Sequence, residues 1–242
     1  MHSIIIIPTY NEKENIEQMI SALLKLQLPG KTEILIIDDA SPDGTGKIVD
    51  EMKKKFSNIS CIHRASKMGL GSAYREGFRE AIKRGAQNLI AMDADFSHNP
   101  FYLPEMIQKA QYADLVIGSR YVKNGGQKGW SCTRRLLSWG ANLFARTMLS
   151  LQTRDTTAGF KCYTSKVFQQ VAIDSIHSDG YSFQIETVFF IERAGLRVTE
   201  IPIIFENRRR GASKISRGEV LQGVFTVFRL FVSRFTDPKQ SL

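Results

Sequence analysis

Two aspartates separated by one residue, Asp93 and Asp95, directly follow the apolar run at residues 89–92. In extended backbone this spacing places both carboxylates on one side of the chain, where they can hold one hard divalent cation that bridges a diphosphate. Such a pair also occurs by chance on surface loops, where it has no function. Ending a buried strand in two carboxylates is costly unless a metal or another partner compensates their charge. The position of the pair therefore predicts a metal site.

Two other apolar runs end in residues that suit nucleotide binding. The first is followed by Pro-Thr-Tyr-Asn-Glu at residues 8–12, and the second by Asp38 and Asp39. A carboxylate at such a strand end can accept hydrogen bonds from a base or a ribose, and Tyr10 can stack on a base. The two aspartates also have a structural interpretation, in which one of them caps the turn into the next helix together with Asp43.

The elements that position these residues alternate between short apolar runs and amphipathic stretches. Continuous apolar runs suit strands covered on both faces, as in a parallel sheet flanked by helices. We therefore predict an α/β doubly wound fold, in which ligands bind beyond the carboxyl ends of the strands. The expected strands are residues 3–7, 33–37, 59–63, 88–92 and 114–117, and the expected helices are residues 14–26, 44–56, 71–84 and 101–111.

The pattern changes after Gly118. A glycine-rich stretch at residues 124–129 is expected to be a mobile loop. Further helices are predicted over residues 133–151, 166–172 and 182–194, followed by a strand at 196–203 and a basic loop. The chain has no internal repeat, and we expect one domain spanning residues 1–242.

The last predicted helix has two contrasting faces. Its arginines, Arg217, Arg229 and Arg234, could lie among phosphate headgroups if the helix rests in a membrane interface. The helix could equally pack on the domain, because aromatic stripes at helical spacing are more often core. Residues 213–236 are thus a possible membrane-interface helix, too short and too charged to span a bilayer. The apolar face comprises Val220, Val224, Val227, Phe228, Phe231 and Phe235, widened by Leu221, Phe225 and Val232.

The chain of 242 residues carries a formal net charge of +9, which attracts anions such as nucleic acid, anionic lipid or phosphorylated small molecules. The excess of basic residues could also simply keep the protein soluble. We expect a cytoplasmic protein, because the sequence has no stretch of about 20 apolar residues and no signal-peptide pattern. Cys61, Cys132 and Cys162 lack the paired spacing of a zinc site or a disulfide framework and are expected to be reduced thiols.

The ordered set of motifs resembles the family 2 glycosyltransferases of the GT-A fold. The motifs shared with this family are residues 8–12, 38–39 with 41–45, 69–73, 93–98 and 118–121. Later segments are similar to the dolichol-phosphate mannose synthase branch, namely residues 125–126, 129–130, 134–135, 155–160, 180–186 and 211–214. The resemblance covers nearly the whole chain.

The resemblance implies transfer of mannose from GDP-mannose to a dolichyl or polyprenyl phosphate, with inversion at the anomeric carbon and with Mg²⁺ or Mn²⁺ as cofactor. The implied donor pocket consists of Pro8, Tyr10, Glu12 and Asp39 around the guanosine, with Ile37 nearby. The implied metal site consists of Asp93 and Asp95, with Ala94 and Ser97 close to the metal. Several microbial relatives have glutamine where Ser97 stands.

The implied phosphate contacts are basic. Arg120, Arg208 and Lys214 would contact the phosphates or the sugar of the donor, and Arg134 or Arg135 would contact the acceptor phosphate. Residues 208–210 and Lys214 flank Gly211 and suit phosphate oxygens as a flexible cationic loop, with a plain solvated charge run as the alternative.

The implied nucleophile shapes the expected mechanism. A phosphate monoester has a second pKa of about 6, so it is largely deprotonated at neutral pH and needs no protein base. The expected catalytic groups are Asp95 with its metal, Arg120 and Lys214, because they stabilise charge on the departing GDP.

The implied setting is peripheral, at a cytoplasmic membrane surface, where small membrane-anchoring subunits recruit some relatives. A sibling enzyme that moves glucose or another hexose from a UDP donor to a polyprenyl phosphate is the nearest alternative. A basic nucleic-acid-binding protein is disfavoured, because aspartates at three strand ends repel phosphates unless metal neutralises them. A catalytically silent scaffold with the same fold is a third alternative.

Overall fold

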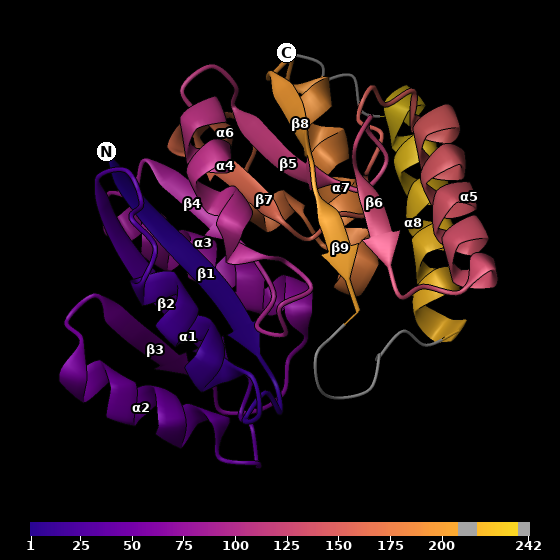
Figure 1. Ribbon diagram of the computed structural model, residues 1–242. Helices are drawn as coiled ribbons and strands as arrows, with labels where there is room; N and C mark the ends of the chain where they lie inside the picture. The colour runs from indigo at the N-terminus through magenta and orange to yellow at the C-terminus, as the bar shows by residue number, and fades with distance from the viewer. Residues whose placement is uncertain (208–216, 237–242) are drawn as a thin grey trace.

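A computed structural model describes residues 1–207 and 217–236 of the chain, and residues 208–216 and 237–242 lie outside this description. The described residues build a central sheet of seven strands in the order β3-β2-β1-β4-β7-β5-β8 and a separate two-stranded ribbon of β6 and β9 (Figure 1). The central strands are β1 (His2–Thr9), β2 (Lys31–Asp38), β3 (Ile59–His63), β4 (Asn88–Ala91), β5 (Leu115–Ser119), β7 (Lys161–Thr164) and β8 (Val198–Pro202). The ribbon strands are β6 (Gly126–Lys128) and β9 (Ile204–Glu206).

Most of the central sheet is parallel, as the sequence predicts. β1 pairs in parallel with β2 and β4, β2 pairs with β3, and β5 pairs with β8. The exception is β7, which runs antiparallel between β4 and β5 and joins the two parallel parts. Because the carboxyl ends of parallel strands meet at one edge of a sheet, the segments that follow β1, β2, β4 and β5 converge there.

Helices cover both faces of this sheet, so the chain forms three layers (Figure 1). One face is covered by α1 (Ile16–Leu24), α2 (Thr45–Lys55) and α4 (Leu103–Lys109), the last preceded by a short 3₁₀ turn, Pro100–Tyr102. The other face carries α3 (Leu70–Lys83), α6 (Ser165–Gln170) and α7 (Gly180–Arg193), with a second 3₁₀ turn at Ile173–Ser175. The long helices α5 (Cys132–Leu149) and α8 (Arg217–Thr236) run side by side and extend this second layer.

The side chains of β1 show how the sequence builds two cores. Ile4 and Ile6 pack into the layer of α3 and α7, whereas Ile5 and Ile7 pack into the layer of α1 and α4. All four are fully buried. A strand with helices on both faces needs apolar side chains at every position, which is why the continuous isoleucine run predicts a parallel strand correctly.

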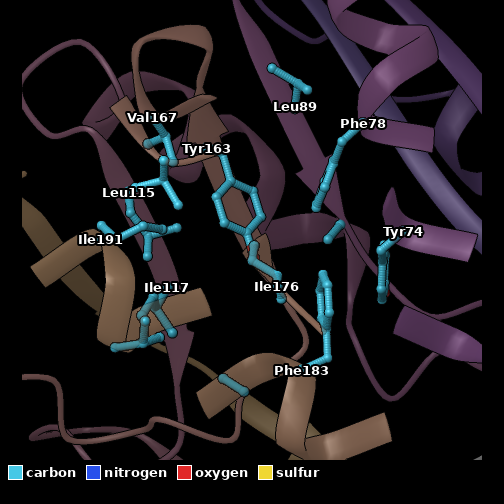
Figure 2. Packing of buried hydrophobic residues seen from close by; sticks show 14 of the residues in the cluster. Tyr74, Phe78, Leu89, Leu115, Ile117, Tyr163, Val167, Ile176, Phe183 and Ile191 are labelled. Atoms are coloured by element: carbon cyan, nitrogen blue, oxygen red, sulfur yellow. The ribbon is translucent and has the colours of Figure 1, made fainter. Parts of the chain in front are cut away.

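Aromatic rings fill part of the second layer (Figure 2). Tyr74 of α3 lies nearly parallel to Phe183 of α7, with ring centroids 5.8 Å apart and planes at 14°. Phe78 of α3 meets Tyr163 of β7 edge to face at 5.1 Å. Pairs in these geometries add stability beyond the burial of their area. They fix α3, α7 and β7 relative to one another.

Three features of the carboxyl-terminal half differ from the sequence expectation. The glycine-rich stretch at 124–129 is not simply a loop, because residues 126–128 form β6 and pair with β9. The strand expected at 196–203 ends at Pro202, and the chain then enters the ribbon as β9. β7 lies in a segment for which the sequence predicts no element, and it places a fully buried lysine in the sheet.

The last helix combines the two alternatives that its sequence left open. Val227 and Leu230 are buried against α5 and α7, whereas Leu221, Phe225 and Val232 are more than half exposed. One apolar stripe therefore packs on the domain while the other faces outward. No helix in the two described ranges is long and apolar enough to cross a membrane.

Two arginines of α8, Arg229 and Arg234, bond to the domain that carries them. Arg229 donates from Nη2 to Glu186 Oε1 at 2.6 Å and to Ser178 Oγ at 3.1 Å. Arg234 donates to Ser150 Oγ at 3.1 Å, beside the end of α5. For these two arginines the contacts favour the alternative in which the helix packs on the domain, because both bond to the domain that carries them.

Candidate active site

A cavity of about 490 Å³ lies at the carboxyl ends of the strands, where the fold predicts a ligand. The ends of β1, β2, β4 and β5 all contribute to its wall. From the expected site, the lining residues are Pro8, Tyr10, Glu12, Asp39, Asp93, Ala94, Asp95 and Arg120. The sequence thus brings most of its predicted donor and metal residues to one place.

The loops after three of these strands turn sharply through left-handed backbone. Asn11 after β1 has a φ of 57°, Ala40 after β2 has a φ of 55°, and Phe96 after β4 has a φ of 65°. Left-handed conformations are unfavourable for alanine and phenylalanine and cluster at functional sites. Their recurrence at the cavity edge indicates that the loops are shaped for what they hold.

The carboxylate of Asp95 is fixed by the turn that follows it. Ser97 donates to Asp95 Oδ1 twice, from its backbone nitrogen at 3.0 Å and from Oγ at 2.6 Å. The left-handed backbone at Phe96 lets the chain turn back for both bonds. Asp95 is only 3% exposed, so its carboxylate is held at the cavity wall in a defined orientation. Ser97 therefore positions Asp95, whether or not it also touches a metal.

Asp93 is supported from its backbone by His98. The backbone nitrogen of Asp93 donates to Nδ1 of His98 at 2.9 Å. A neutral imidazole whose Nδ1 accepts a hydrogen bond carries its proton on Nε2, so this contact selects the tautomer. The His98 ring is buried, stacks on Phe160 with centroids 5.1 Å apart and lines the cavity. Asp93 itself is more open to the cavity, with 38% of its side chain exposed.

Asp39 lines the cavity but is largely bonded within the protein. Its Oδ1 accepts from Nη1 of Arg64 at 2.7 Å, and its two oxygens also accept from the backbone nitrogens of Met68 and Gly69 at 2.9 to 3.1 Å. The side chain of Arg64 is 2% exposed. This carboxylate therefore anchors the loop that leads into α3, and a contact with guanosine would come in addition to these bonds.

The remaining residues of the predicted nucleotide end differ in their environment. Tyr10 lies in the wall, with Nζ of Lys67 4.0 Å from its ring centroid, so a cation already covers one ring face. Glu12 accepts from Asn15 Nδ2 at 2.9 Å. Ile37, expected near the guanosine, is fully buried in the hydrophobic core and does not line the cavity. That expectation is corrected, because Ile37 faces the α3 layer.

The guanidinium of Arg120 is a fixed positive charge in the cavity wall. Its Nε donates to Asp155 Oδ2 at 2.8 Å and its Nη2 to Oδ1 at 2.6 Å, and Nη2 also donates to Thr157 at 2.7 Å. Asp155 is fully buried. Burial opposes the charge on Arg120, but the attraction and hydrogen bonds of Asp155 outweigh it and raise the pKa of Arg120.

The predicted acceptor arginines lie beside the cavity rather than in its wall. Arg134 stacks over Trp130, which lines the cavity, with 4.0 Å between guanidinium carbon and ring centroid. It also donates to Asn207 Oδ1 at 3.0 Å. Arg135 is exposed and donates to the backbone oxygen of Gln127 at 2.9 Å. The predicted donor contacts Arg208 and Lys214 lie outside the described residues.

A fourth aspartate closes the wall on the side of α3. Asp179, just before α7, accepts a hydrogen bond from the backbone nitrogen of Gly71 and lines the cavity. A methyl group on Gly69 or Gly71 would lie 2.3 or 2.6 Å from an Asp179 oxygen. Both glycines are therefore needed for this approach, which gives the glycine motif at residues 69–71 a physical reason.

Other residues of the cavity wall are not among the predicted site residues. Many of them belong to the motifs at 93–98, 129–130, 155–160 and 180–186, but only the fold brings these distant segments together. These residues are His98, Trp130, Thr157, Ala158, Gly159, Gly180, Tyr181 and Gln184, with Lys67, Asp179, Phe205 and Gln222 outside those motifs.

Solved structures share this arrangement of sheet and helices. Glucosyl-3-phosphoglycerate synthase from Mycobacterium tuberculosis superimposes with a TM-score of 0.67 at 17% identity, over 98% of this chain and 81% of the other. A mannosyltransferase from Pyrobaculum calidifontis, solved in complex with GDP-Man and Mn²⁺, gives a TM-score of 0.61 at 14% identity, over 98% of this chain and 65% of the other. The fold is the GT-A fold of nucleotide-sugar transferases.

The sequence comparisons are more specific. The model of the family described as glycosyl transferase family 2 matches residues 4–176, and the chain belongs to that family. It is 41% identical over 229 residues to an undecaprenyl-phosphate mannosyltransferase from Micrococcus luteus, which covers 95% of this chain and 93% of the relative. It is 39% identical over 227 residues to a polyprenol monophosphomannose synthase from Mycolicibacterium smegmatis, which covers 93% of this chain and 85% of the relative. The chain is therefore a glycosyltransferase, as its motifs predict.

Proposed function

We propose that this glycosyltransferase moves mannose from GDP-mannose to a polyprenyl or dolichyl phosphate, with inversion at the anomeric carbon. The names of the two relatives support the sugar and the acceptor class, and GDP-Man in the Pyrobaculum structure supports the donor. The observation that carries the proposal is the placement of Asp93, Asp95 and Arg120 in one cavity at the strand ends. We treat residues 1–242 as one catalytic unit.

The carboxylates of Asp93 and Asp95 fit a divalent cation. Both line the cavity, and the bonds from Ser97 hold the Asp95 carboxylate in a fixed orientation. Among the described residues, no group of three or more His, Cys, Asp and Glu side chains could hold a metal alone. This suits a Mg²⁺ or Mn²⁺ ion that takes one or two carboxylates from the protein and its other oxygens from a diphosphate. When bound, such an ion would neutralise charge on the departing nucleotide.

The donor would lie across the cavity with its nucleotide toward β1 and β2. Pro8, Tyr10 and Glu12 line that end, and Asp39 holds the adjacent loop through Arg64. Arg120 stands near the opposite end as a permanent cation, suited to the diphosphate or the developing charge on it. Arg208 and Lys214, by resemblance, would add further cationic contacts.

The acceptor phosphate would approach past Trp130 and the two arginines at the start of α5. Arg134, stacked on Trp130, and Arg135 offer guanidinium groups for a phosphate. No protein base is required, because the attacking phosphate is already deprotonated at neutral pH. The task of these residues is to orient the phosphate in line with the anomeric carbon.

The outer faces of α5 and α8 support a position at a membrane surface. α5 exposes Leu136, Leu137 and Trp139, of which Leu137 is 70% exposed, and the adjacent α8 exposes Phe225 to the same 70%. Exposed apolar side chains on neighbouring helices beside basic residues are typical of interfacial binding. α8 also places Gln222 in the cavity wall, so the same helix carries part of the exposed apolar surface and part of the site. The same surface would also accept small membrane-anchoring subunits.

Calorimetric titration tests the donor. We expect GDP-mannose to bind in the presence of Mn²⁺ or Mg²⁺ and to bind at least tenfold more weakly after chelation with EDTA. GDP-glucose, UDP-glucose and UDP-GlcNAc serve as competitors. Tighter binding of UDP-glucose than of GDP-mannose would instead identify the sibling hexosyltransferase, and no metal-dependent donor binding by folded protein would support a silent scaffold.

Kinetics with a polyprenyl phosphate test the acceptor. We expect the double variant Arg134→Ala/Arg135→Ala to raise KM for the acceptor about tenfold or more while KM for GDP-mannose changes little, because both arginines lie beside the cavity and away from its nucleotide end. Equal increases for both substrates would contradict the assignment.

Flotation with vesicles containing anionic lipid tests the membrane surface. We expect Leu137→Glu/Phe225→Glu to lose vesicle binding, because each change places a charge on the exposed apolar face. Tyr112→Glu is the matched control, since Tyr112 is 72% exposed and follows α4 in the opposite helical layer. Retention of binding by the double variant would exclude α5 and α8 as the membrane surface.

A further inference from the structure

The centre of the sheet contains a buried lysine that the mechanism above does not use. Lys161 is the first residue of β7, pairs with Ala91 of β4 and Ile117 of β5, and is fully buried. Its Nζ donates to the side-chain oxygen Oε1 of Gln184 at 2.8 Å and to the backbone oxygen of the same residue at 3.0 Å. A lysine at this position is costly and therefore calls for a reason.

These two bonds determine how the Gln184 amide is oriented. The amide could point either end at Lys161, but an ammonium group has only donors and must face the oxygen. Gln184 lines the cavity, so its Nε2 is the end left to face inward, 3.7 Å from where a methyl group on Gly159 would lie. Gly159 in turn borders His98. The buried lysine thus holds an amide donor in the cavity wall, near Gly159 and His98.

The protonation state of Lys161 does not change this arrangement. Burial lowers the pKa of Lys161 to about 7, against a smaller opposing effect of Asp155. A neutral amine still has two N–H donors, which is the number that Gln184 accepts. The contact with the amide oxygen is therefore possible in both forms, and the ammonium form requires it because it has no acceptor.

We propose that Gln184 determines sugar specificity by donating from Nε2 to a hydroxyl oxygen of the transferred hexose, and that Lys161 is the positioning residue that fixes this amide. The inference rests on the proposed function. It follows from the order of groups in the cavity, because the nucleotide residues lie toward β1 and β2, the metal carboxylates follow β4, and Gln184 enters from α7. A buried, pre-oriented donor discriminates well, because a ligand that lacks the matching oxygen leaves it unpaired.

Binding of GDP-mannose and GDP to one variant tests the role of Gln184. We expect Gln184→Met to weaken the binding of GDP-mannose about tenfold and the binding of GDP less than twofold, because only GDP-mannose carries the hexose. Deoxy analogues of GDP-mannose identify the hydroxyl that accepts from Gln184. The analogue that lacks this hydroxyl should bind Gln184→Met as tightly as it binds the wild-type protein. Equal weakening of GDP and GDP-mannose, or no weakening of either, would overturn the inference.

A second variant tests the positioning role of Lys161. We expect Lys161→Met to bind GDP-mannose about fivefold more weakly than the wild-type protein, with little change in the affinity for GDP. The double variant Lys161→Met/Gln184→Met should bind GDP-mannose no more weakly than Gln184→Met alone. Additive losses would show that Lys161 acts only through general stability. Lys166→Met is the matched control, because Lys166 lies just after β7 with its side chain 52% exposed. If Lys161→Met does not fold, the Gln184→Met comparison still decides the contact.

The design separates this inference from the proposed function. If wild-type protein binds UDP-glucose and not GDP-mannose, the proposed function fails, and the same comparison is made with UDP-glucose and UDP. A selective loss of the nucleotide sugar in Gln184→Met would then still support the role of Gln184. If wild-type protein transfers mannose as proposed and Gln184→Met behaves like wild type, only the further inference fails.

Discussion

Two acidic pairs end neighbouring parts of the sheet, and they look alike in sequence but differ in structure. At the end of β2, Asp38 accepts from Thr9 at 3.0 Å and Asp39 accepts from Arg64 at 2.7 Å, so both carboxylates are bonded within the protein, although Asp39 also lines the cavity. After β4, the carboxylates of Asp93 and Asp95 line the cavity together. The difference teaches that similar acidic pairs at strand ends can serve either the protein's own loops or a cavity, depending on which groups bond to each carboxylate.

Arg64 is the residue that makes this difference. It follows β3, reaches across to β2, and contacts Asp39, Ser72 and Glu76 with a side chain only 2% exposed. In the second pair, the Ser97 amide and hydroxyl donate to the Asp95 carboxylate, and the His98 ring accepts from the backbone nitrogen of Asp93. The two bonds from Ser97 are neutral, so they orient the Asp95 carboxylate without cancelling its charge.

The largest effect is expected from removing a carboxylate of the second pair. Asp95→Ala should lower kcat by about a thousandfold or more, because the proposed metal loses a ligand and the departing nucleotide loses its neutralising charge. The variant should remain folded, since a buried carboxylate is removed without opening the apolar core. Steady-state transfer assays with circular dichroism check both. Near-normal turnover at saturating metal would refute the assignment of Asp95.

The matching change in the first pair should act on stability instead. Asp39→Ala leaves the buried guanidinium of Arg64 without its main partner, which we expect to lower the free energy of unfolding by about 3 kcal/mol. Urea denaturation measures the loss. Asp39→Ala/Arg64→Met should recover part of it, because the unpaired charge is gone. A stable Asp39→Ala protein that has lost only donor affinity would show that Asp39 belongs with the ligand groups after all.

The buried amine of Lys161 should make the free energy of unfolding depend on pH. Its pKa falls from 10.5 in the unfolded chain to about 7 in the fold, so the unfolded chain binds more protons between these values and stability rises as pH rises through them. Between pH 7 and 9 the free energy of unfolding should rise by roughly 2 kcal/mol relative to Lys161→Met, at about 1.4 kcal/mol per pH unit at most. Equal pH dependence of both proteins would contradict the burial of a charged amine.

The same contrast explains what the sequence could predict. Apolar runs of β1, β2 and β4 and the acidic spacing at Asp93 and Asp95 are local signals, so the parallel sheet and the cavity residues of the first half follow from them. The partner of Asp39 could not be predicted, because Arg64 lies 25 positions away and only the β2-β3 pairing brings it near.

The carboxyl-terminal half depends on such long-range partners throughout. β7 contains a lysine that is tolerated only because Gln184 of α7 accepts from it, and Arg120 is fixed by Asp155. No local sequence pattern predicts either contact. The motifs at 155–160 and 180–186 mark the right segments, but which side chain faces the cavity depends on where β7 inserts between β4 and β5.

The smallest expected effect distinguishes orientation from ligation within the second pair. Ser97→Ala removes the 2.6 Å bond from Oγ to Asp95 but keeps the backbone bond at 3.0 Å, so the carboxylate should lose only part of its support. We expect kcat/KM to fall about five- to tenfold, equivalent to about 1 kcal/mol. The concentration of Mn²⁺ that gives half-maximal activity should change less than threefold. A shift of that concentration by tenfold or more would show that Ser97 ligates the cation directly, and the contrast between the two acidic pairs would then rest on a hydroxyl ligand as well as on the pairing of Asp39 with Arg64.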